Sequence, residues 1–291
     1  MSGIYKSEVG KQAIESFYRK ALDQWPVDNE QRSVPTRFGN TFVICCGPAS
    51  APPAMLLHGS GINSVIWIRD VVEWTKRHRV YAVDIIGEPG FSAPVRPPLR
   101  SSAYAEWLDD VQHQLGLTAA SLVGVSLGGW IALDYAVRRP ARVASLSLIS
   151  PSGLGRRKEL FMVKAGLLLL LGKQGVEKAL AAAVGNAQLA SPMAEYVRLI
   201  FENFRPRREA PPLRSDEELR ALALPMQVIV GMKDALLDSG HTRERVTRLV
   251  PRAELTCLED AGHVLPPQTS RVGEFLAGVW SGHEHQRCVE V

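Results

Sequence analysis

Short apolar segments alternate with helical segments along most of this chain, and this alternation limits the folds open to it. The expected strands are residues 54–57, 79–85, 121–125, 143–149, 226–230 and 253–258. The expected helices are residues 65–77, 103–115, 127–138, 242–249 and 269–280. Strands joined by helices form a parallel sheet with both faces covered, through right-handed crossovers. The pattern therefore predicts an α/β fold with a mostly parallel sheet.

The N-terminal part of the chain departs from this pattern. Apolar residues recur at helical spacing from Ser7 to Trp25, which predicts an amphipathic helix that ends at Pro26. Residues 36–46 are interpreted as a β-hairpin that turns at Gly39 and Asn40, because this residue pair suits positive φ angles. An extra helix and a hairpin therefore precede the alternating segments.

The alternation stops between residues 151 and 224. This region contains no convincing strand, and its expected helices are residues 159–171, 175–183 and 193–204. We therefore expect a core made of residues 1–150 and 225–291, with a helical cap formed by residues 151–224. The polar tail, residues 281–291, is expected to fray.

Composition excludes several classes of function. The chain has 291 residues, with 34 Lys and Arg against 30 Asp and Glu, and this net charge of +4 does not favour nucleic-acid binding. The arginine-rich stretches 156–158 and 205–208 are interpreted as solvated loop surface rather than an anion site. The sequence contains no apolar run long enough to span a membrane.

Cysteine usage points to a reducing compartment. The four cysteines, at positions 45, 46, 257 and 288, follow no ligand or disulfide spacing, and we expect all four to be reduced thiols. Neighbouring residues of a strand point to opposite faces, which makes Cys45 and Cys46 poor partners. The first ten residues are polar and lack an apolar signal core. These features predict a cytoplasmic protein.

The pentapeptide from Gly124 to Gly128 has the form G-x-S-x-G and contains Ser126. A buried strand is expected before it and a helix after it, which is the context of a nucleophile elbow. In such an elbow a sharp turn exposes the serine hydroxyl above the sheet, and the glycines leave room for the turn. Ser126 is therefore the candidate nucleophile.

A nucleophilic serine needs a histidine base and an acid that orients it, and this arrangement places them in the order Ser, Asp or Glu, His. His263 lies in a loop directly after the expected strand 253–258 and is the candidate base. Asp234 follows the expected strand 226–230 and is the candidate acid. Asp238 is its rival, although Asp238 or Ser239 could also cap the following helix.

Two backbone N–H groups usually bind the oxyanion in such a site: one from the residue after the nucleophile and one from the loop after the third strand. The first is Leu127. The second is expected from the loop His58-Gly59-Ser60-Gly61, at Ser60, with His58 bracing the loop.

Together these residues resemble the α/β-hydrolase superfamily, in its serine carboxylesterase-like branch. The matching elements, in order, are residues 58–61, 84–92, 124–129, 231–234 and 262–263. The resemblance implies an eight-stranded, mostly parallel sheet with a helical cap inserted after the sixth strand. It also implies an acyl-serine mechanism without a metal or an organic cofactor. Aspartate-nucleophile relatives, such as epoxide hydrolases, are disfavoured by Ser126.

The sequence therefore predicts a hydrolase acting on a small, largely apolar carboxylic ester. The expected cap is rich in apolar residues, and Met162 and Leu168 are its candidate substrate contacts. Thioesterase, lactonase and carbon–carbon bond hydrolase activities would use the same triad. A biosynthetic lyase, cyclase or acyltransferase, or a ligand receptor, could be built on the same scaffold. The sequence does not indicate the natural substrate or the oligomeric state.

Overall fold

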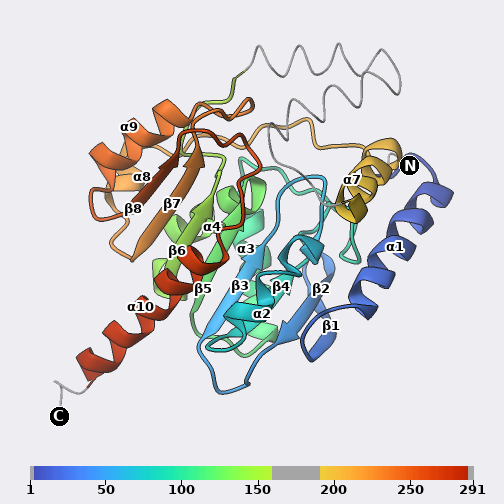
Figure 1. The fold of residues 1–291 in the computed structure, drawn as a ribbon, viewed down its shortest axis with the longest axis horizontal. Helices are drawn as coiled ribbons and strands as arrows, with labels where there is room; N and C mark the ends of the chain where they lie inside the picture. Colours follow the sequence, from blue (N-terminus) through green and yellow to red (C-terminus); the bar gives the residue numbers. More distant parts are fainter. Residues whose placement is uncertain (1–2, 159–190, 288–291) are drawn as a thin grey trace.

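The computed structural model describes residues 3–158 and 191–287, and its centre is a single twisted sheet (Figure 1). The described chain forms eight strands in the order β1-β2-β4-β3-β5-β6-β7-β8. Their bounds are β1 Asn29–Thr36, β2 Gly39–Cys46, β3 Pro53–Leu57, β4 Arg79–Val83, β5 Ala120–Val125, β6 Val143–Ile149, β7 Met226–Gly231 and β8 Glu254–Leu258. Strand β2 is antiparallel to β1 and β4, and the remaining pairs are parallel. The predicted α/β fold is confirmed.

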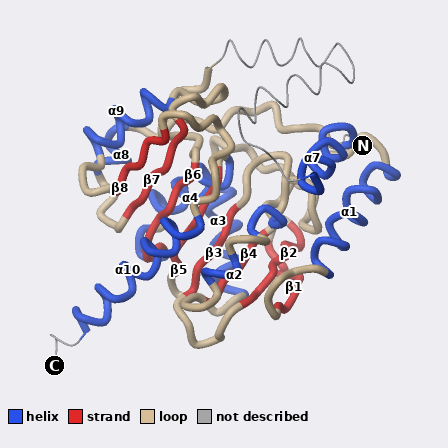
Figure 2. Tube along the Cα trace, viewed as in Figure 1, coloured by secondary structure: helices blue, strands red, loops and turns tan. Residues whose placement is uncertain are grey.

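Helices cover both faces of the sheet (Figure 2). The described helices of four or more residues are α1 Glu8–Asp23, η1 Ser64–Trp67, α2 Val71–Trp74, α3 Ala103–Gln114, α4 Leu127–Arg138, α7 Ser191–Asn203, α8 Asp216–Arg220, α9 Ser239–Leu249 and α10 Thr269–Arg287. Apolar side chains of α3, α4 and α9 form the core on one face, and those of α1, α2, α7 and α10 form the core on the other.

Successive residues of a strand place their side chains alternately in the core on one face of the sheet and in the core on the other. Cys45 is buried with the α3 and α4 side, whereas Cys46 is buried with the α1 and α2 side. These two thiols therefore point to opposite faces, as predicted. Cys45, Cys46 and Cys257 are all free. Cys288 lies outside the described residues.

Four predictions of local structure are wrong. The hairpin pairs Thr36 with Gly39, so its loop is Arg37 and Phe38, and Gly39 takes its positive φ of 99° as it enters β2. Strand β1 was missed because it is an edge strand: Val34 is its only buried residue, so it lacks an apolar alternation. Residues 65–77 form two short helical segments, η1 and α2, instead of one helix, and the Asn63 side chain caps the first by accepting the Val65 N–H.

The fourth wrong prediction is the end of the last helix. Helix α10 continues to Arg287, beyond the predicted end at residue 280. Within residues 281–287 only Gly282 is a poor helix former, and the segment contains no proline. A polar sequence therefore does not interrupt this helix.

Helix α1 packs beside α7, although residues 24–190 lie between them in the sequence (Figure 1). Ser7 caps α1 by accepting from the Gly10 N–H at 3.0 Å. The buried Tyr18 donates its hydroxyl to Asp84 Oδ1 at 3.0 Å, and the Phe17 ring stacks on Tyr196 of α7 at 4.5 Å. The N-terminal helix therefore anchors part of the segment between β6 and β7.

Helices α7 and α8 are the described helices between β6 and β7, where the sequence predicts a cap. The division into a core and a cap stays a prediction. Met162 and Leu168 lie outside the described residues. In the part of the chain that is described, no helix combines the length and the apolar character needed to cross a membrane.

The arginine-rich stretch 205–208 is not a solvated surface as a whole. The Arg207 side chain is 7% exposed, and it donates to the Tyr104 hydroxyl at 2.6 Å and to the Pro97 carbonyl at 3.1 Å. Arg205 donates to the carbonyl oxygens of Gly3 and Tyr5. The sequence-based interpretation was wrong for Arg207, whose side chain is buried, whereas Arg205 is exposed as predicted.

Candidate active site

Ser126 lies in a sharp turn between β5 and α4, at φ 51° and ψ −108°. A non-glycine residue with positive φ stores strain, and such strain clusters at functional sites. Glycine is required on both sides of the turn. A Cβ atom on Gly124 would lie 2.5 Å from the Gly128 carbonyl oxygen, and one on Gly128 would lie 2.1 Å from the Leu57 carbonyl oxygen. The sequence expectation of a tight elbow is confirmed.

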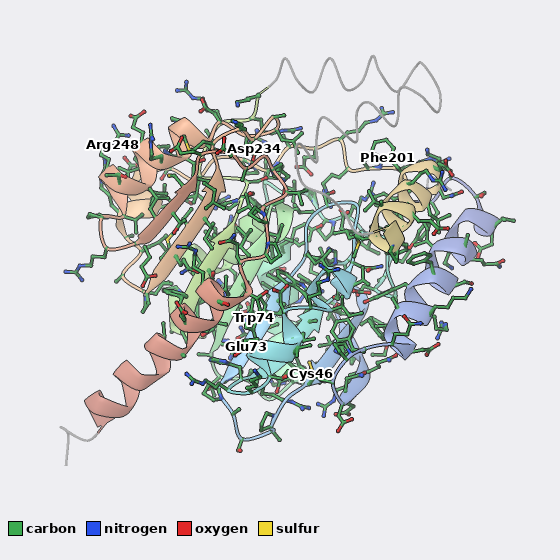
Figure 3. All side chains as sticks on the ribbon, in the orientation of Figure 1. Cys46, Glu73, Trp74, Phe201, Asp234 and Arg248 are labelled. Atoms are coloured by element: carbon green, nitrogen blue, oxygen red, sulfur yellow. The ribbon has the colours of Figure 1, made fainter. Side chains whose placement is uncertain are left out.

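The structure brings together Ser126, His263 and Asp234. His263 Nε2 lies 3.1 Å from Ser126 Oγ, and His263 Nδ1 lies 2.7 Å from Asp234 Oδ2. The three residues follow the carboxyl ends of β5, β8 and β7, which meet at one edge of the sheet. Figure 3 labels Asp234 at this end of β7. This arrangement can pass a proton from the serine hydroxyl to an oriented imidazole.

Asp234 and Asp238, the two acids that the sequence left open, have different partners. Asp234 is 1% exposed, and its Oδ1 accepts the N–H groups of Leu236 and Leu237 at 2.7 and 3.0 Å. Its Oδ2 is thereby directed at His263. Asp238 caps α9 by accepting the His241 N–H at 3.0 Å. Asp234 is therefore the acid that contacts the histidine.

The loop His58–Gly61 passes directly beside Ser126. A Cβ atom on Gly59 would lie 3.7 Å from the Ser126 Cβ. Within the described residues, neither the Ser60 N–H nor the Leu127 N–H has a hydrogen-bond acceptor. Two backbone donors beside the serine hydroxyl can bind a negatively charged oxygen.

His58 braces this loop, as the sequence predicts. Its ring is buried, its Nε2 accepts the Ile85 N–H at 2.9 Å, and its Nδ1 lies 2.8 Å from the Gly59 carbonyl oxygen. Because Nε2 accepts, the proton is assigned to Nδ1, which donates to Gly59. Burial lowers the pKa of His58, which keeps the ring neutral.

A large apolar cavity of about 1630 Å³ opens beside Ser126 and His263. Its walls come from η1 and α2, from α7, from the loop 258–269 and from α1. The α1 contribution includes Phe17 and Ala21, which sequence analysis missed. Helical periodicity identifies a buried face of α1 but cannot tell a core contact from a cavity wall.

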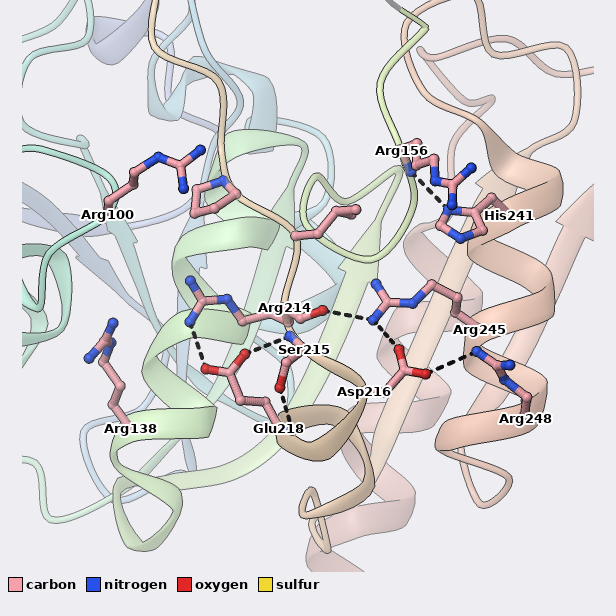
Figure 4. A pocket seen from close by; sticks show the side chains of 12 residues that line it. Arg100, Arg138, Arg156, Arg214, Ser215, Asp216, Glu218, His241, Arg245 and Arg248 are labelled. Carbon is pink, nitrogen blue, oxygen red and sulfur yellow. Dashed lines mark hydrogen bonds and ion pairs between the residues drawn. The ribbon is translucent and has the colours of Figure 1, made fainter.

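A second cavity, of about 740 Å³, is lined mainly by charged residues from α4, α8 and α9 (Figure 4). Its arginines are largely paired with acids: Arg214 contacts Asp134 and Glu218, while Arg245 and Arg248 contact Asp216. None of the three residues Ser126, His263 and Asp234 lines it. The candidate active site therefore opens to the first cavity, which Ser126 and His263 line.

Residues 54–277 match the family model described as the alpha/beta hydrolase family. The chain belongs to the α/β-hydrolase family. Two similar α/β hydrolases come from Bacillus subtilis. The uncharacterized carboxylesterase nap is 32% identical over 260 residues, which cover 85% of each chain. Carboxylesterase YbfK is 30% identical over 276 residues, which cover 90% of this chain and 92% of that protein.

Solved structures of α/β hydrolases from the same organism agree with this fold. Carboxylesterase CesB (YbfK) superimposes with a TM-score of 0.84 at 30% identity, covering 93% of this chain and 99% of the other. Naproxen esterase (carboxylesterase NP) gives 0.81 at 29% identity, covering 95% and 99%. The relatives thus include carboxylesterases, as the resemblance in the sequence implies.

Proposed function

We propose that this α/β hydrolase is a carboxylic-ester hydrolase that works through an acyl-serine intermediate. The observation that carries the proposal is the hydrogen-bonded series Asp234, His263 and Ser126, of which His263 and Ser126 line an apolar cavity. The carboxylesterase names of relatives near 30% identity support the same reaction class.

The reaction begins when Ser126 Oγ attacks the ester carbonyl and His263 Nε2 takes the serine proton. Asp234 holds the imidazole in the right tautomer and stabilises its cation. The N–H groups of Ser60 and Leu127 bind the oxyanion of the tetrahedral intermediate. The protonated His263 then gives its proton to the leaving alcohol. Water activated by His263 attacks the acyl-enzyme, and the acid is released.

The cavity lining favours a largely apolar acyl or alcohol part. Its walls carry Ile62, Ile66, Val197 and Leu265, together with other aliphatic and aromatic side chains. Burying apolar substrate groups there contributes binding energy in proportion to the area removed from water. A cap formed by residues 151–224, with substrate contacts from Met162 and Leu168, is part of this proposal. The cytoplasmic location predicted from the sequence stays a prediction.

The proposal is tested with a panel of aryl and alkyl esters, thioesters and lactones, with Ser126→Ala as the blank. We expect turnover of short aryl esters that the blank lacks. Preferential turnover of thioesters or lactones would reassign the substrate class. Absence of any turnover dependent on Ser126 would favour a receptor or a non-hydrolytic enzyme and overturn the proposal. Labelling by an aryl sulfonyl fluoride, mapped by peptide mass, should be confined to Ser126.

A further inference from the structure

A buried carboxylate, Glu88, lies under the loop that contains Ser60. Glu88 is 2% exposed, and its Oε2 accepts two hydrogen bonds, from Ser60 Oγ at 3.1 Å and from the Gly61 N–H at 2.7 Å. Its other oxygen, Oε1, is buried without a hydrogen-bond partner in the described chain. Every hydrogen bond of this side chain therefore goes to one loop.

Burying a carboxylate is costly, so a residue of this type needs a reason to be here. Burial raises the pKa of Glu88, against the opposing effects of the Gly61 N–H and the nearby Arg96. No lysine or arginine in the described residues forms an ion pair with Glu88 within 4.0 Å. An apolar side chain would avoid this cost but could not accept the two donors of the loop.

The contacts of Glu88 and His58 together determine which way the Ser60 N–H points. His58 Nδ1 donates to the Gly59 carbonyl oxygen, which belongs to the same peptide unit as the Ser60 N–H. In a trans peptide these two groups point in opposite directions, so fixing the oxygen fixes the N–H. Glu88 holds the next peptide unit through the Gly61 N–H. The peptide unit that contains the Ser60 N–H and the peptide unit that follows it therefore both have a fixed orientation.

Glu88 is itself held in place by the turn that carries it. Gly87 has a φ of 75°, its N–H donates to the Ala93 carbonyl at 2.9 Å, and its carbonyl accepts from Arg96 Nε at 2.9 Å. A Cβ atom on Gly87 would lie 2.5 Å from the Arg96 Cγ. This turn gives the carboxylate a defined position instead of a flexible one.

We infer that Glu88 is a positioning residue for the oxyanion site, and that it keeps the Ser60 N–H directed at the oxygen that becomes negative. The inference rests on the proposed function, in which that N–H binds the tetrahedral intermediate. A negative charge close to an oxyanion would oppose it. Glu88 therefore contributes through the position of its oxygen, and its charge is not needed.

Two conservative variants distinguish the effect of the position of the Glu88 oxygen from the effect of its negative charge. Glu88→Gln keeps an oxygen acceptor at the same distance from the backbone and removes the charge. Glu88→Asp keeps the charge but is one methylene shorter, so it cannot reach both Ser60 and Gly61. We expect kcat within about fivefold of wild type for Gln. For Asp and Ala we expect a loss of about 100-fold, near the cost of one oxyanion donor.

The affinity for an arylboronic acid distinguishes a residue that positions the oxyanion site from one that only supports the fold. This probe adds to Ser126 Oγ and forms a tetrahedral adduct, whereas KM reports mainly on the apolar cavity. We expect the boronate affinity of Glu88→Asp and Glu88→Ala to fall by the same factor as kcat, with KM within about threefold. Thermal unfolding monitored by circular dichroism shows that each variant is folded.

The outcomes are distinct. Wild-type boronate affinity and kcat in folded Glu88→Asp would overturn the inference, as would losses of equal size in the Gln and Asp variants. If Glu88→Ala does not fold, the Gln and Asp pair still decides. Boronate binding requires Ser126 but no ester substrate. Failure of the ester panel would therefore contradict the proposed function without deciding the role of Glu88.

Discussion

Gly231, the last residue of β7, lies directly against the carbonyl oxygen of Gly262, the residue before His263. A Cβ atom on Gly231 would be 2.2 Å from that oxygen and 2.5 Å from the carbonyl oxygen of Ala261. Both contacts are with backbone, which cannot rotate away as a flexible side chain can. The absence of a side chain at Gly231 thus allows the histidine loop to approach the strand that leads to Asp234.

Gly231→Ala should separate these two segments and displace His263. We expect a loss of stability of about 1–3 kcal/mol, typical of overpacking. We also expect kcat for an aryl ester to fall about 100-fold, because small misplacements of a catalytic group are costly. Gly278→Ala in α10 is the matched control, since a Cβ atom there would meet no atom of the described residues within 4 Å. Equal kcat values in the two variants would contradict this reading.

Ser126→Ala and His263→Ala should each lower ester turnover at least about a thousandfold, because either change removes the nucleophile–base pair. Ester turnover by the double variant should be within about threefold of turnover by the slower single variant, since the two residues act as one unit. Steady-state rates with one aryl ester measure all three. Retention of more than a tenth of wild-type turnover by Ser126→Ala would contradict the acyl-enzyme mechanism.

Asp234→Asn should lower kcat by about 10³–10⁴-fold, because an amide cannot stabilise the imidazolium and favours the wrong tautomer of His263. Asp238→Asn is the control from the same loop. Asparagine caps helices as well as aspartate does, so its kcat should stay within about threefold of wild type. The opposite ranking of the two variants would reassign the acid.

Val197 on α7 lines the cavity, whereas Arg198 beside it is exposed and does not. Val197→Trp should lower kcat/KM for long or bulky esters at least about tenfold relative to an acetate ester, because specificity follows the fit of apolar groups. Arg198→Trp should leave the preference unchanged. A flat preference across acyl and alcohol lengths in Val197→Trp would show that this wall does not select the substrate.

The neutral, buried His58 should make stability fall in acid. Burial lowers its pKa in the folded protein below 6.5, its ordinary value, so the unfolded chain binds more protons just below pH 6.5. The free energy of unfolding should therefore decrease as the pH falls through this window and be insensitive to His58 above it. Urea unfolding at pH 7.5, 6.5 and 5.5 should show a weaker decrease for His58→Gln. Parallel pH profiles would contradict the assignment.

Local sequence determined the elbow at Ser126. It also reduced the number of candidates for the histidine base and for the acid. The strand, the G-x-S-x-G turn and the helix are contiguous, so their geometry depends on backbone sterics within about ten residues around Ser126. Strand ends also predicted that His263 lies near Ser126, because the carboxyl ends of parallel strands share one edge, and the two side chains are 3.1 Å apart in the structure. The alternation of buried strands and helices was sufficient to predict the parallel strands β3 to β8.

Tertiary structure decided the features whose partners are distant in the chain. Asp234 and Asp238 share one loop. The contact with His263, 29 residues beyond Asp234, shows which of the two carboxylates meets the histidine. Glu88 acquires its role from Ser60, 28 residues before it, and no local pattern marks that contact. The stacking of Phe17 on Tyr196 makes α1 a cavity wall. Periodicity reports which face of an element is buried, whereas long-range packing determines what that face contacts.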